Sequence, residues 1–415
     1  MSEDRGSVRK YARIAESKTW GTYVSMYYKT EKANDRVLTR GPLFVKFEPP
    51  VMSTPTSDDS KKLILVIGAT GAQGLAVVDK LLAPCEDGSP SPYAVRALTR
   101  NPQSQRAKAL AEQGVEIVQG KFDDFDSVAV ALKGAYGAWI NTDGFTVGIE
   151  KEVWCGIRIY ELARQARIKH YVWSSLDYAS KLMDFNPIYR CEHSDGKGIV
   201  ADFLKSQPSV VSDTDMSWTI VTSGPYMDML QNIMFGPLKR RIDGTVVFAM
   251  PIKNGHAPMI ALSDLGFFAR YTFDNREGTS GQDLSIASDW VGWEYLKSTF
   301  ERVTGQKAEI IHQSLDEWFE NFERVDYPIA NERTYGDGST TWKENFQCWW
   351  AMWRDDVVKK DYDWIRKVNP KGHTLESWMR EQQYGPELFQ RSDYVLKNVE
   401  EGKGAMPNWE RIDKL

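Results

Sequence analysis

The sequence predicts an α/β fold in which a doubly wound parallel sheet is followed by a smaller α+β C-terminal domain. Between residues 62 and 223, apolar segments of strand length alternate with amphipathic segments of helix length. The first strand, "LILVIG" (63–68), is apolar throughout, which is typical of a parallel strand buried on both faces. The glycine-rich stretch "GATGAQG" (68–74) then leads directly into a helix, as in nucleotide-binding α/β proteins.

The other elements of the sheet region follow in order. Further strands are expected at 93–100, 115–120, 135–142, 170–176 and 217–225, separated by helices at 72–83, 104–114, 125–134, 152–167 and 196–207. After Pro225 the alternation is less regular. There, "TVVFAMP" (245–251) and "HAPMIAL" (256–262) are expected to pair as a hairpin, and Ser314 with Glu317 predicts a capping box.

These patterns divide the chain into four parts. Residues 61–225 are expected to form an NADP(H)-binding Rossmann domain, and 226–383 a smaller, aromatic-rich domain for a substrate or partner. Residues 384–415 are a C-terminal tail. Residues 1–60 are expected to be an N-terminal extension that is disordered or a non-native start, because they mix basic and aromatic residues without the apolar core of a secretory signal.

Composition narrows the function classes. The 415 residues carry a net charge of −5, so the chain lacks the basic excess that direct nucleic-acid binding requires. No apolar stretch approaches the roughly 20 residues of a membrane span. The four cysteines are dispersed, which favours reduced thiols in a cytoplasmic protein, with the nucleus as a further compartment. Cysteines and histidines form no cluster with metal-ligand spacing, so no metal is expected.

The glycine loop predicts a dinucleotide site. Gly68 allows the tight turn off the strand, Gly71 lets a pyrophosphate approach the backbone, and Gly74 lets the helix pack closely. The free N–H groups at the start of the helix then face the phosphates. The second strand ends in "ALTRNP" without the carboxylate of an NAD site, whereas Arg100 can hold a 2′-phosphate. NADP(H) is therefore the expected cofactor.

The ordered motifs resemble a known family. They are "GATGAQG", "VRALTRNP", "GVEIVQGKFDD", "GAYGAWINTD", "HYVWSSL", "EHSDGKGIVADFL", "IALSDLG", "LSIAS" and "VNPKGHTLESWM". Over roughly residues 62–380 the chain resembles the NmrA-like family of atypical short-chain dehydrogenases, and within it the NADPH sensors of human type. The Trp-rich stretch at 335–354 fits the family less well, and the tail after about residue 383 has no counterpart in it.

The resemblance implies a set of cofactor contacts. The glycine loop would meet the pyrophosphate, Arg100 the 2′-phosphate, and Lys197 the nicotinamide ribose. Pro225 and Tyr226 would lie beside the nicotinamide. The cofactor-binding residues implied in this way are Gly68, Thr70, Gly71, Ala72, Gln73, Gly74, Arg100, Asp123 (beside the adenine), Thr142, Ser174, Lys197 and Tyr226.

The catalytic pair of the short-chain dehydrogenases is incomplete in this sequence. Short-chain dehydrogenases use Tyr-x-x-x-Lys on one helical face, but the residue four before Lys197 is His193. An imidazole ordinarily titrates near neutrality, so His193 with Lys197 is one candidate pair for proton transfer, and a helix-start residue without catalytic role is the alternative. Tyr178, three residues before Lys181, and Tyr189 are further candidates, although neither has the required spacing to Lys197.

Two functions therefore stay open. One is an NADP(H)-dependent oxidoreductase of the atypical short-chain type, which transfers a hydride to or from a small organic substrate. The other is a non-catalytic NADPH/NADP redox sensor that regulates a protein partner such as a transcription factor. The missing tyrosine favours the sensor. Ten of the fifteen tryptophans lie beyond residue 289, and this aromatic-rich region, able to build a substrate pocket, favours the enzyme.

Overall fold

The computed structural model describes residues 10–14, 24–28, 61–385, 396–397, 402–403 and 405–415. The chain divides into two units, residues 1–57 and 58–415. The described residues of the first unit form an antiparallel pair, β1 (Lys10–Ile14) and β2 (Val24–Tyr28). The expectations for the rest of the N-terminal extension fall on residues outside those described.

A seven-stranded sheet forms the centre of the second unit, and all of its neighbouring strands run parallel. In spatial order the strands are β12 (Asp283–Ser285), β8 (Ser217–Ser223), β7 (His170–Leu176), β6 (Gly137–Ile140), β3 (Lys62–Ile67), β4 (Tyr93–Thr99) and β5 (Glu116–Gln119). The order reverses between β3 and β6, which is where ligands bind in doubly wound sheets. The predicted fold class is confirmed.

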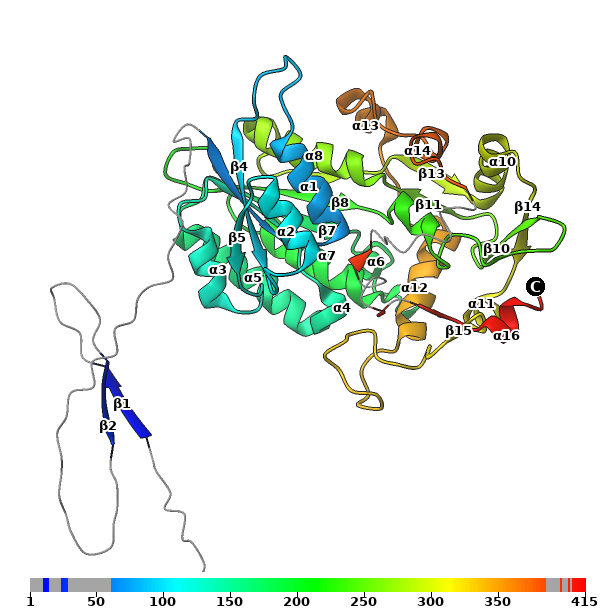
Figure 1. Cartoon of the computed structure of the whole chain (residues 1–415), viewed down its shortest axis with the longest axis horizontal. Coiled ribbons are helices and arrows are strands. Elements are labelled where there is room, and N and C mark those ends of the chain that lie inside the picture. The colour runs from blue at the N-terminus through cyan, green and yellow to red at the C-terminus, as the bar shows by residue number, and fades with distance from the viewer. Residues whose placement is uncertain (1–9, 15–23, 29–60, 386–395, 398–401, 404) are drawn as a thin grey trace, which may run out of the picture. The chain divides into compact units, whose positions relative to one another are not determined.

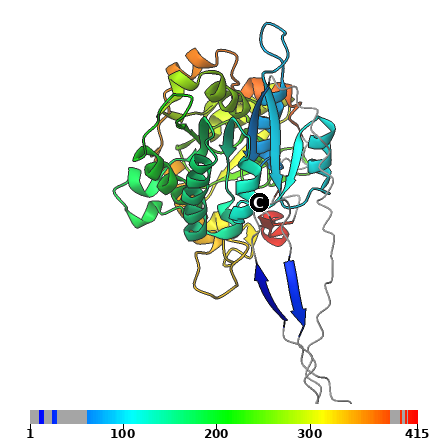
Figure 2. The ribbon, with the colours of Figure 1, turned by 90° about the vertical axis from the view of Figure 1, so that its left-hand side faces the viewer.

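Helices cover both faces of this sheet (Figure 1, Figure 2). One face packs against α3 (Phe125–Leu132), α5 (Ile149–Gln165) and α7 (Glu192–Lys205). The other face packs against α1 (Ala72–Leu82), α2 (Gln105–Glu112) and α8 (Leu262–Asp274). The central strand β3 is buried on both faces, which explains its uninterrupted apolar sequence.

The chain returns to the large sheet after residue 225. Strand β12 adds to its edge, where Leu284 pairs with Val221 of β8. Helix α8 also comes from this later part of the chain and covers the sheet beside α1. Elements from both sides of residue 225 therefore build the large sheet and the helices that cover it.

The remaining strands form small sheets near the C-terminal core. Strand β10 (Val246–Met250) is parallel to β14 (Ala308–His312) and antiparallel to β9 (Lys239–Arg240). Strand β11 (His256–Met259) pairs with β13 (Asp289–Gly292). The predicted hairpin between "TVVFAMP" and "HAPMIAL" is therefore wrong. Because β10 is buried along its whole length, it takes partners at both edges, and the next strand in sequence supplies neither.

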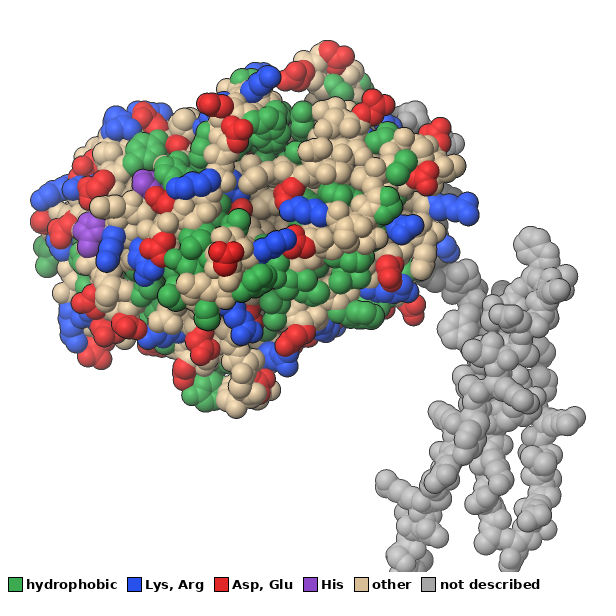
Figure 3. All heavy atoms as spheres, turned by 180° about the vertical axis from the view of Figure 1, so that it is seen from behind, with side chains coloured by type: hydrophobic (Ala, Val, Ile, Leu, Met, Phe, Trp, Pro, Cys, Tyr) green, Lys and Arg blue, Asp and Glu red, His purple; other side chains and the backbone are tan. Residues whose placement is uncertain are grey.

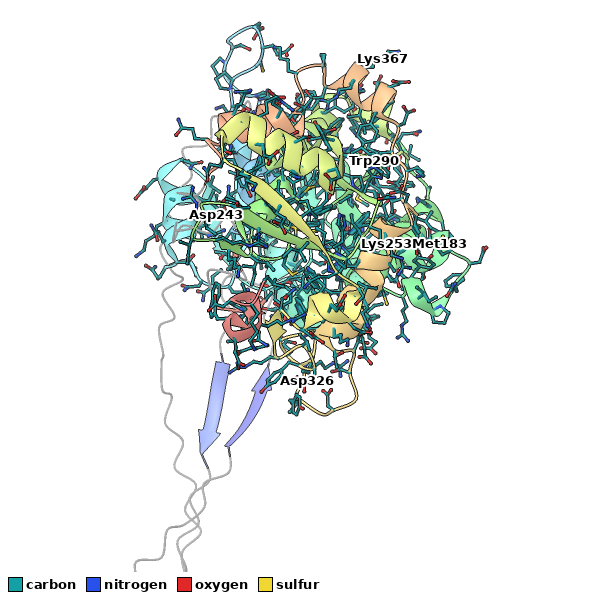
Figure 4. The ribbon with its side chains drawn as sticks, turned by 90° about the vertical axis from the view of Figure 1, so that its right-hand side faces the viewer. Met183, Asp243, Lys253, Trp290, Asp326 and Lys367 are labelled. Carbon is teal, nitrogen blue, oxygen red and sulfur yellow. The ribbon has the colours of Figure 1, made fainter. Side chains whose placement is uncertain are left out.

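Aromatic side chains make up much of the C-terminal core. Trp349, Trp350 and Trp353, all on α12 (Trp342–Arg354), are buried there. They pack with α10 (Trp293–Thr304) and the small sheets. Figure 4 shows this side of the chain, with Asp243 in the β9–β10 turn and Trp290 on β13 labelled. Most of the tryptophan block is thus packing, as its large apolar area favours.

The surface mixes charges of both signs. On the face shown in Figure 3, acidic and basic side chains are interspersed around patches of apolar ones. Among the described residues, no helix has both the length and the apolar character needed to cross a bilayer.

His373 joins α8 to α14 (Leu375–Glu381) and predicts a pH-dependent stability. Its Nδ1 is 3.1 Å from Asp264 Oδ1, and its Nε2 is 2.7 Å from Glu381 Oε2. The contact with Asp264, reinforced by Glu381, raises the pKa of His373 to about 9. A histidine with a raised pKa in the folded state stabilises the protein fully below its unfolded pKa, and this contribution is lost as the pH rises through 9.

We expect the free energy of unfolding to fall by about 2–3 kcal/mol between about pH 6 and about pH 9.5, by linkage to this single group. Urea denaturation at both pH values measures the change. In His373→Gln this fall should be smaller by the same amount. An unchanged pH dependence in that variant would show that His373 does not carry the effect.

Candidate functional site

The loop between β3 and α1 places its glycines under three different steric demands. Gly68 has a φ of +83°, in the left-handed region, and a Cβ there would lie 2.8 Å from Asn141 O. A Cβ on Gly74 would collide with the carbonyl of Gly68, so the close packing of α1 on the loop requires glycine. Gly71 lines a cavity, and a Cβ there would lie 3.3 Å from Gly68 O. Gly71 is thus the glycine whose missing side chain leaves room for a ligand.

The cavity has a volume of about 1070 Å³ and lies at the carboxyl ends of the parallel strands. Its lining contains most of the residues expected to bind a cofactor or act in catalysis: Gly68, Thr70, Gly71, Ala72, Gln73, Arg100, Thr142, Ser174, His193, Lys197 and Tyr226. Gly74 lies behind the loop instead. The structure therefore brings together residues that span more than 150 positions of sequence.

The lining is strongly basic although the whole chain is acidic. Eight lysines and arginines face it: Arg100, Lys121, Lys197, Lys239, Arg240, Arg324, Lys397 and Lys403. Against them stand two acidic residues, Asp143 and Glu323. A cleft lined by one sign of charge concentrates ligands of the other sign. The cavity is suited to an anionic ligand.

Arg100 and Lys121 extend this charge beyond the glycine loop. Arg100 follows β4 and is exposed in the cavity wall. Lys121 follows β5, the next strand of the sheet, and lines the same region. Arg106, at the start of α2, donates from Nη1 to the backbone oxygen of Thr70 at 3.1 Å. This contact supports the glycine loop from outside.

Asp123 does not lie in the cavity wall. Its Oδ2 forms an ion pair with Lys151 Nζ at 2.7 Å. Burial opposes the charge of this carboxylate, but the hydrogen bond from Lys151 prevails and keeps the pKa of Asp123 below its usual range. The neighbouring Phe122 lines the cavity in its place.

A chain of hydrogen bonds connects the glycine loop to two strand ends. Ser174 Oγ, on β7, donates to Gln73 Oε1 at 2.6 Å. The amide nitrogen of Gln73 donates at 3.3 Å to Oη of Tyr226, a residue that follows β8. Burial raises the pKa of Tyr226 to about 12. The phenol is therefore held neutral, and it closes the inner wall between α1 and β8.

Lys197, on α7, reaches the end of β6. Its Nζ donates to Asn141 Oδ1 at 3.1 Å, to Thr142 O at 3.0 Å and to Thr142 Oγ1 at 3.3 Å. Glu152 Oε1 lies 3.3 Å from the same nitrogen. Four acceptors thus surround an ammonium that has three N–H donors. A ligand hydroxyl that binds Lys197 must displace one of them.

Glu152 balances this charge in the interior. Its side chain, on α5, has no exposed surface, and its Oε1 accepts from Thr142 Oγ1 at 2.7 Å. Gly144 and Gly196 lie directly beside Oε2, which makes no hydrogen bond within the described structure. Because a buried charge is costly unless it is paired, Glu152 and Lys197 depend on each other.

His193 lies one turn before Lys197 on α7, with its ring buried in the cavity wall. The side-chain amide of Asn345, on α12, faces Nδ1, with its nitrogen at 2.9 Å and its oxygen at 3.2 Å. When the amide nitrogen donates to Nδ1, the proton of the neutral ring is on Nε2. Burial lowers the pKa of His193 to about 4, and the charge of Lys197 acts in the same direction. With this lowered pKa the ring is neutral near pH 7, because it is shielded from water.

The two alternative tyrosines lie elsewhere. Tyr189 Oη donates to Asp355 Oδ2 at 2.9 Å. Tyr178 packs against the backbone of Gly198 and the ring of Phe185. Neither tyrosine is part of the cavity lining. Tyr226 is the tyrosine expected from sequence that faces the cavity.

An aromatic wall completes the cavity beside His193. It consists of Phe145, Trp342 and Phe346. The ring of Phe145 stacks on His193 with 4.8 Å between centroids, and Phe346 lies 4.8 Å from Trp342. This wall could bind the apolar part of an organic molecule.

Several site residues were not anticipated from sequence. Lys121 lies within the motif "GVEIVQGKFDD" but was not singled out, and Glu152 lies in no motif. Asn345 contacts His193 across 152 positions of sequence, so no local pattern could reveal it. Asn141 does carry a signal, because it directly precedes Thr142 at the carboxyl end of a strand. Among the described residues, no group of three His, Cys, Asp or Glu is placed to hold a metal ion.

Comparison with known proteins identifies the family of the chain. The sequence model of the NmrA-like family matches residues 60–337. The NmrA-like family domain-containing oxidoreductase hkm9 of Aspergillus hancockii is 29% identical over 281 residues, which cover 64% of this chain and 79% of that protein.

Two solved structures show the same fold. NmrA, a negative transcriptional regulator, in complex with NADP has a TM-score of 0.53 at 18% identity, covering 85% of this chain and 99% of that one. The NADPH-dependent quinone oxidoreductase QOR2 of Escherichia coli, complexed with NADPH, has a TM-score of 0.56 at 18% identity, with coverages of 77% and 99%. The predicted family is confirmed by the family match. The chain belongs to the NmrA-like family.

Proposed function

We propose that this protein is an NADP(H)-dependent oxidoreductase that transfers a hydride between the nicotinamide and a small, partly apolar organic substrate. One observation carries the proposal: a single basic cavity joins the glycine loop to Lys197, His193 and an aromatic wall. A dinucleotide needs the glycine loop to bind its phosphates. An organic substrate beside the nicotinamide needs the aromatic wall. Several relatives are named oxidoreductases, which supports the same class.

The residues of the cavity fit this cofactor. The backbone at Gly71 and the start of α1 would hold the pyrophosphate, since a side chain there would fill the cradle. Arg100 would hold the 2′-phosphate, and Lys197 the nicotinamide ribose. The dinucleotide carries several negative charges, which the excess of lysine and arginine in the lining would balance. When bound, the nicotinamide supplies or accepts the hydride.

His193 and Lys197 would lie beside the substrate group that gains or loses a proton. The neutral imidazole carries its proton on Nε2 when Asn345 donates to Nδ1, so it can donate a hydrogen bond to a substrate carbonyl without being charged. Lys197 would hold the ribose in place, and its ammonium adds positive charge beside the reacting atoms. Phe145, Trp342 and Phe346 would exclude water from this end.

A redox sensor is the second candidate, and the environment of Lys197 favours it. The four acceptors around Nζ leave this ammonium already engaged by the protein. Cofactor binding would then break a contact between α7 and the end of β6. In a sensor this rearrangement would alter the surface that a regulatory protein partner recognises. The sensor binds NADPH but does not oxidise it.

Arg100 tests the cofactor assignment. In Arg100→Ala, the affinity for NADPH should fall by about 10- to 100-fold, because a charge-assisted contact to the 2′-phosphate is worth roughly 1.5–3 kcal/mol. Affinity for NADH should stay within about twofold, since it lacks that phosphate. Fluorescence titration of both nucleotides measures the two constants. Equal wild-type affinities for NADPH and NADH would refute the assignment.

A further inference from the structure

The wall of the cavity continues beyond the part of the chain that defines the family. The family match ends at residue 337, yet the lining extends to Trp409. A group of late residues, here called the C-terminal strap, faces the cavity: Leu396, Lys397, Gly402, Lys403, Ala405, Met406, Pro407 and Trp409. Part of the ligand site is therefore particular to this chain's C-terminal region.

The strap is anchored on the side of the small sheets. Strand β16 (Met406–Pro407) pairs with β15 (Phe322–Glu323), and Asn408 donates from its backbone N–H to Asn321 O at 2.8 Å. Ile412, on α16 (Trp409–Ile412), is buried in the C-terminal core. Figure 1 shows α16 beside β15. These contacts hold the strap residues from Met406 onward beside the cavity.

Lys397 of the strap contacts the glycine loop. Its Nζ lies 3.4 Å from Thr70 Oγ1, between Gly68 and Gly71. Thr70 itself lines the cavity and is nearly buried. Lys397 is half-buried, so its ammonium is partly shielded from the solvent that would screen its charge.

We propose that Lys397 is a cofactor-binding residue, which donates from Nζ to the pyrophosphate of a dinucleotide held on the glycine loop. This inference rests on the proposed function, because it takes the dinucleotide from it. A lysine is suited to this position, since its ammonium carries three N–H donors and a positive charge that attracts a phosphate oxygen. Lys397 would then bind the pyrophosphate at the point where the loop backbone also binds it.

Lys397 and Arg100 should differ in their effect on the preference for NADP(H) over NAD(H). The pyrophosphate is common to NAD(H) and NADP(H), whereas the 2′-phosphate belongs to NADP(H) alone. Lys397 lies at the glycine loop, and Arg100 lies at the end of β4. Lys397 should therefore strengthen the binding of both nucleotides by a similar factor.

Fluorescence titration of NADPH and NADH against the full chain tests the proposal. In Lys397→Ala, we expect both dissociation constants to rise by about five- to twentyfold, the value of one partly exposed charge-assisted contact. Lys397→Arg should restore most of the affinity for both. Lys371→Ala removes one lysine from the surface outside the cavity, where the side chain is 89% exposed, and should change neither constant.

The outcomes separate this proposal from the one on which it rests. If Lys397→Ala binds both nucleotides as tightly as wild type, or loses affinity for NADPH alone, Lys397 does not bind the pyrophosphate. If wild type binds neither nucleotide, the proposed function itself fails. A similar loss of affinity for NADPH and NADH in Lys397→Ala, restored in Lys397→Arg and absent in Lys371→Ala, supports the role proposed for Lys397.

Discussion

Replacement of His193 by alanine is expected to lower turnover by about 10²- to 10⁴-fold, the range for loss of a positioned proton donor or acceptor. The affinity for NADPH should change little, because the contacts proposed for the phosphates and the ribose come from other residues. His193 lines the cavity beside Lys197 and the aromatic wall, where a substrate would meet the nicotinamide. Steady-state rates and NADPH titrations of the same preparation separate the two effects.

The pH dependence gives this prediction a second readout. Since the pKa of His193 is about 4, the ring stays neutral through the physiological range. Wild-type turnover should therefore show no inflection from His193 between about pH 5.5 and about pH 8. His312→Ala is a matched control, because this histidine is exposed and lies outside the cavity lining. Full turnover in His193→Ala would exclude the imidazole from proton transfer.

Gly71→Val should abolish dinucleotide binding while the protein stays folded. Gly71 has φ −80° and ψ 168°, an extended conformation that any residue adopts, and it precedes the first residue of α1. The added methyl groups would enter the cavity and keep the pyrophosphate from the N–H groups of the loop. Loss of two such charge-assisted contacts should raise the dissociation constant of NADPH by more than about 100-fold.

Gly74→Ala is the matched control for this variant. A Cβ at Gly74 would collide with the carbonyl of Gly68, so this substitution should lower the unfolding temperature. Gly71→Val should keep an unfolding temperature close to that of wild type. Thermal denaturation and NADPH titration of both variants distinguish a binding defect from a folding defect. If folded Gly71→Val binds NADPH normally, the loop is only a turn.

Local sequence patterns were enough to predict the sheet and the part of the candidate site at the glycine loop. The apolar run of β3 reflects burial on both faces, and this burial needs only the strand's own sequence to be recognised. Gly68, Gly71 and Arg100 follow directly after strands, and the carboxyl ends of parallel strands meet at one edge of a sheet. The same locality holds for the predicted capping box of Ser314 and Glu317, which is present.

The other end of the site depends on contacts between distant segments. Asn345, Phe346 and Lys397 reach the cavity from parts of the chain that show no motif. The low pKa of His193 depends on burial, to which Asn345 and Phe346 of α12 contribute. Likewise, β10 pairs with β14, about 60 residues later, because strand partners are chosen by the packing of whole elements. Neither effect has a signature within one segment.

The proposed oxidoreductase activity requires that the cavity bind NADPH and that its hydride pass to an organic acceptor. The most direct measurement is single-turnover oxidation of NADPH, followed by absorbance, with a panel of quinones, ketones, enones and imines. We expect that at least one acceptor yields stoichiometric NADP⁺, more slowly when the transferred hydrogen at C4 is deuterium. Tight binding of NADPH without oxidation by any acceptor, together with a change in sedimentation, would contradict it and identify a sensor.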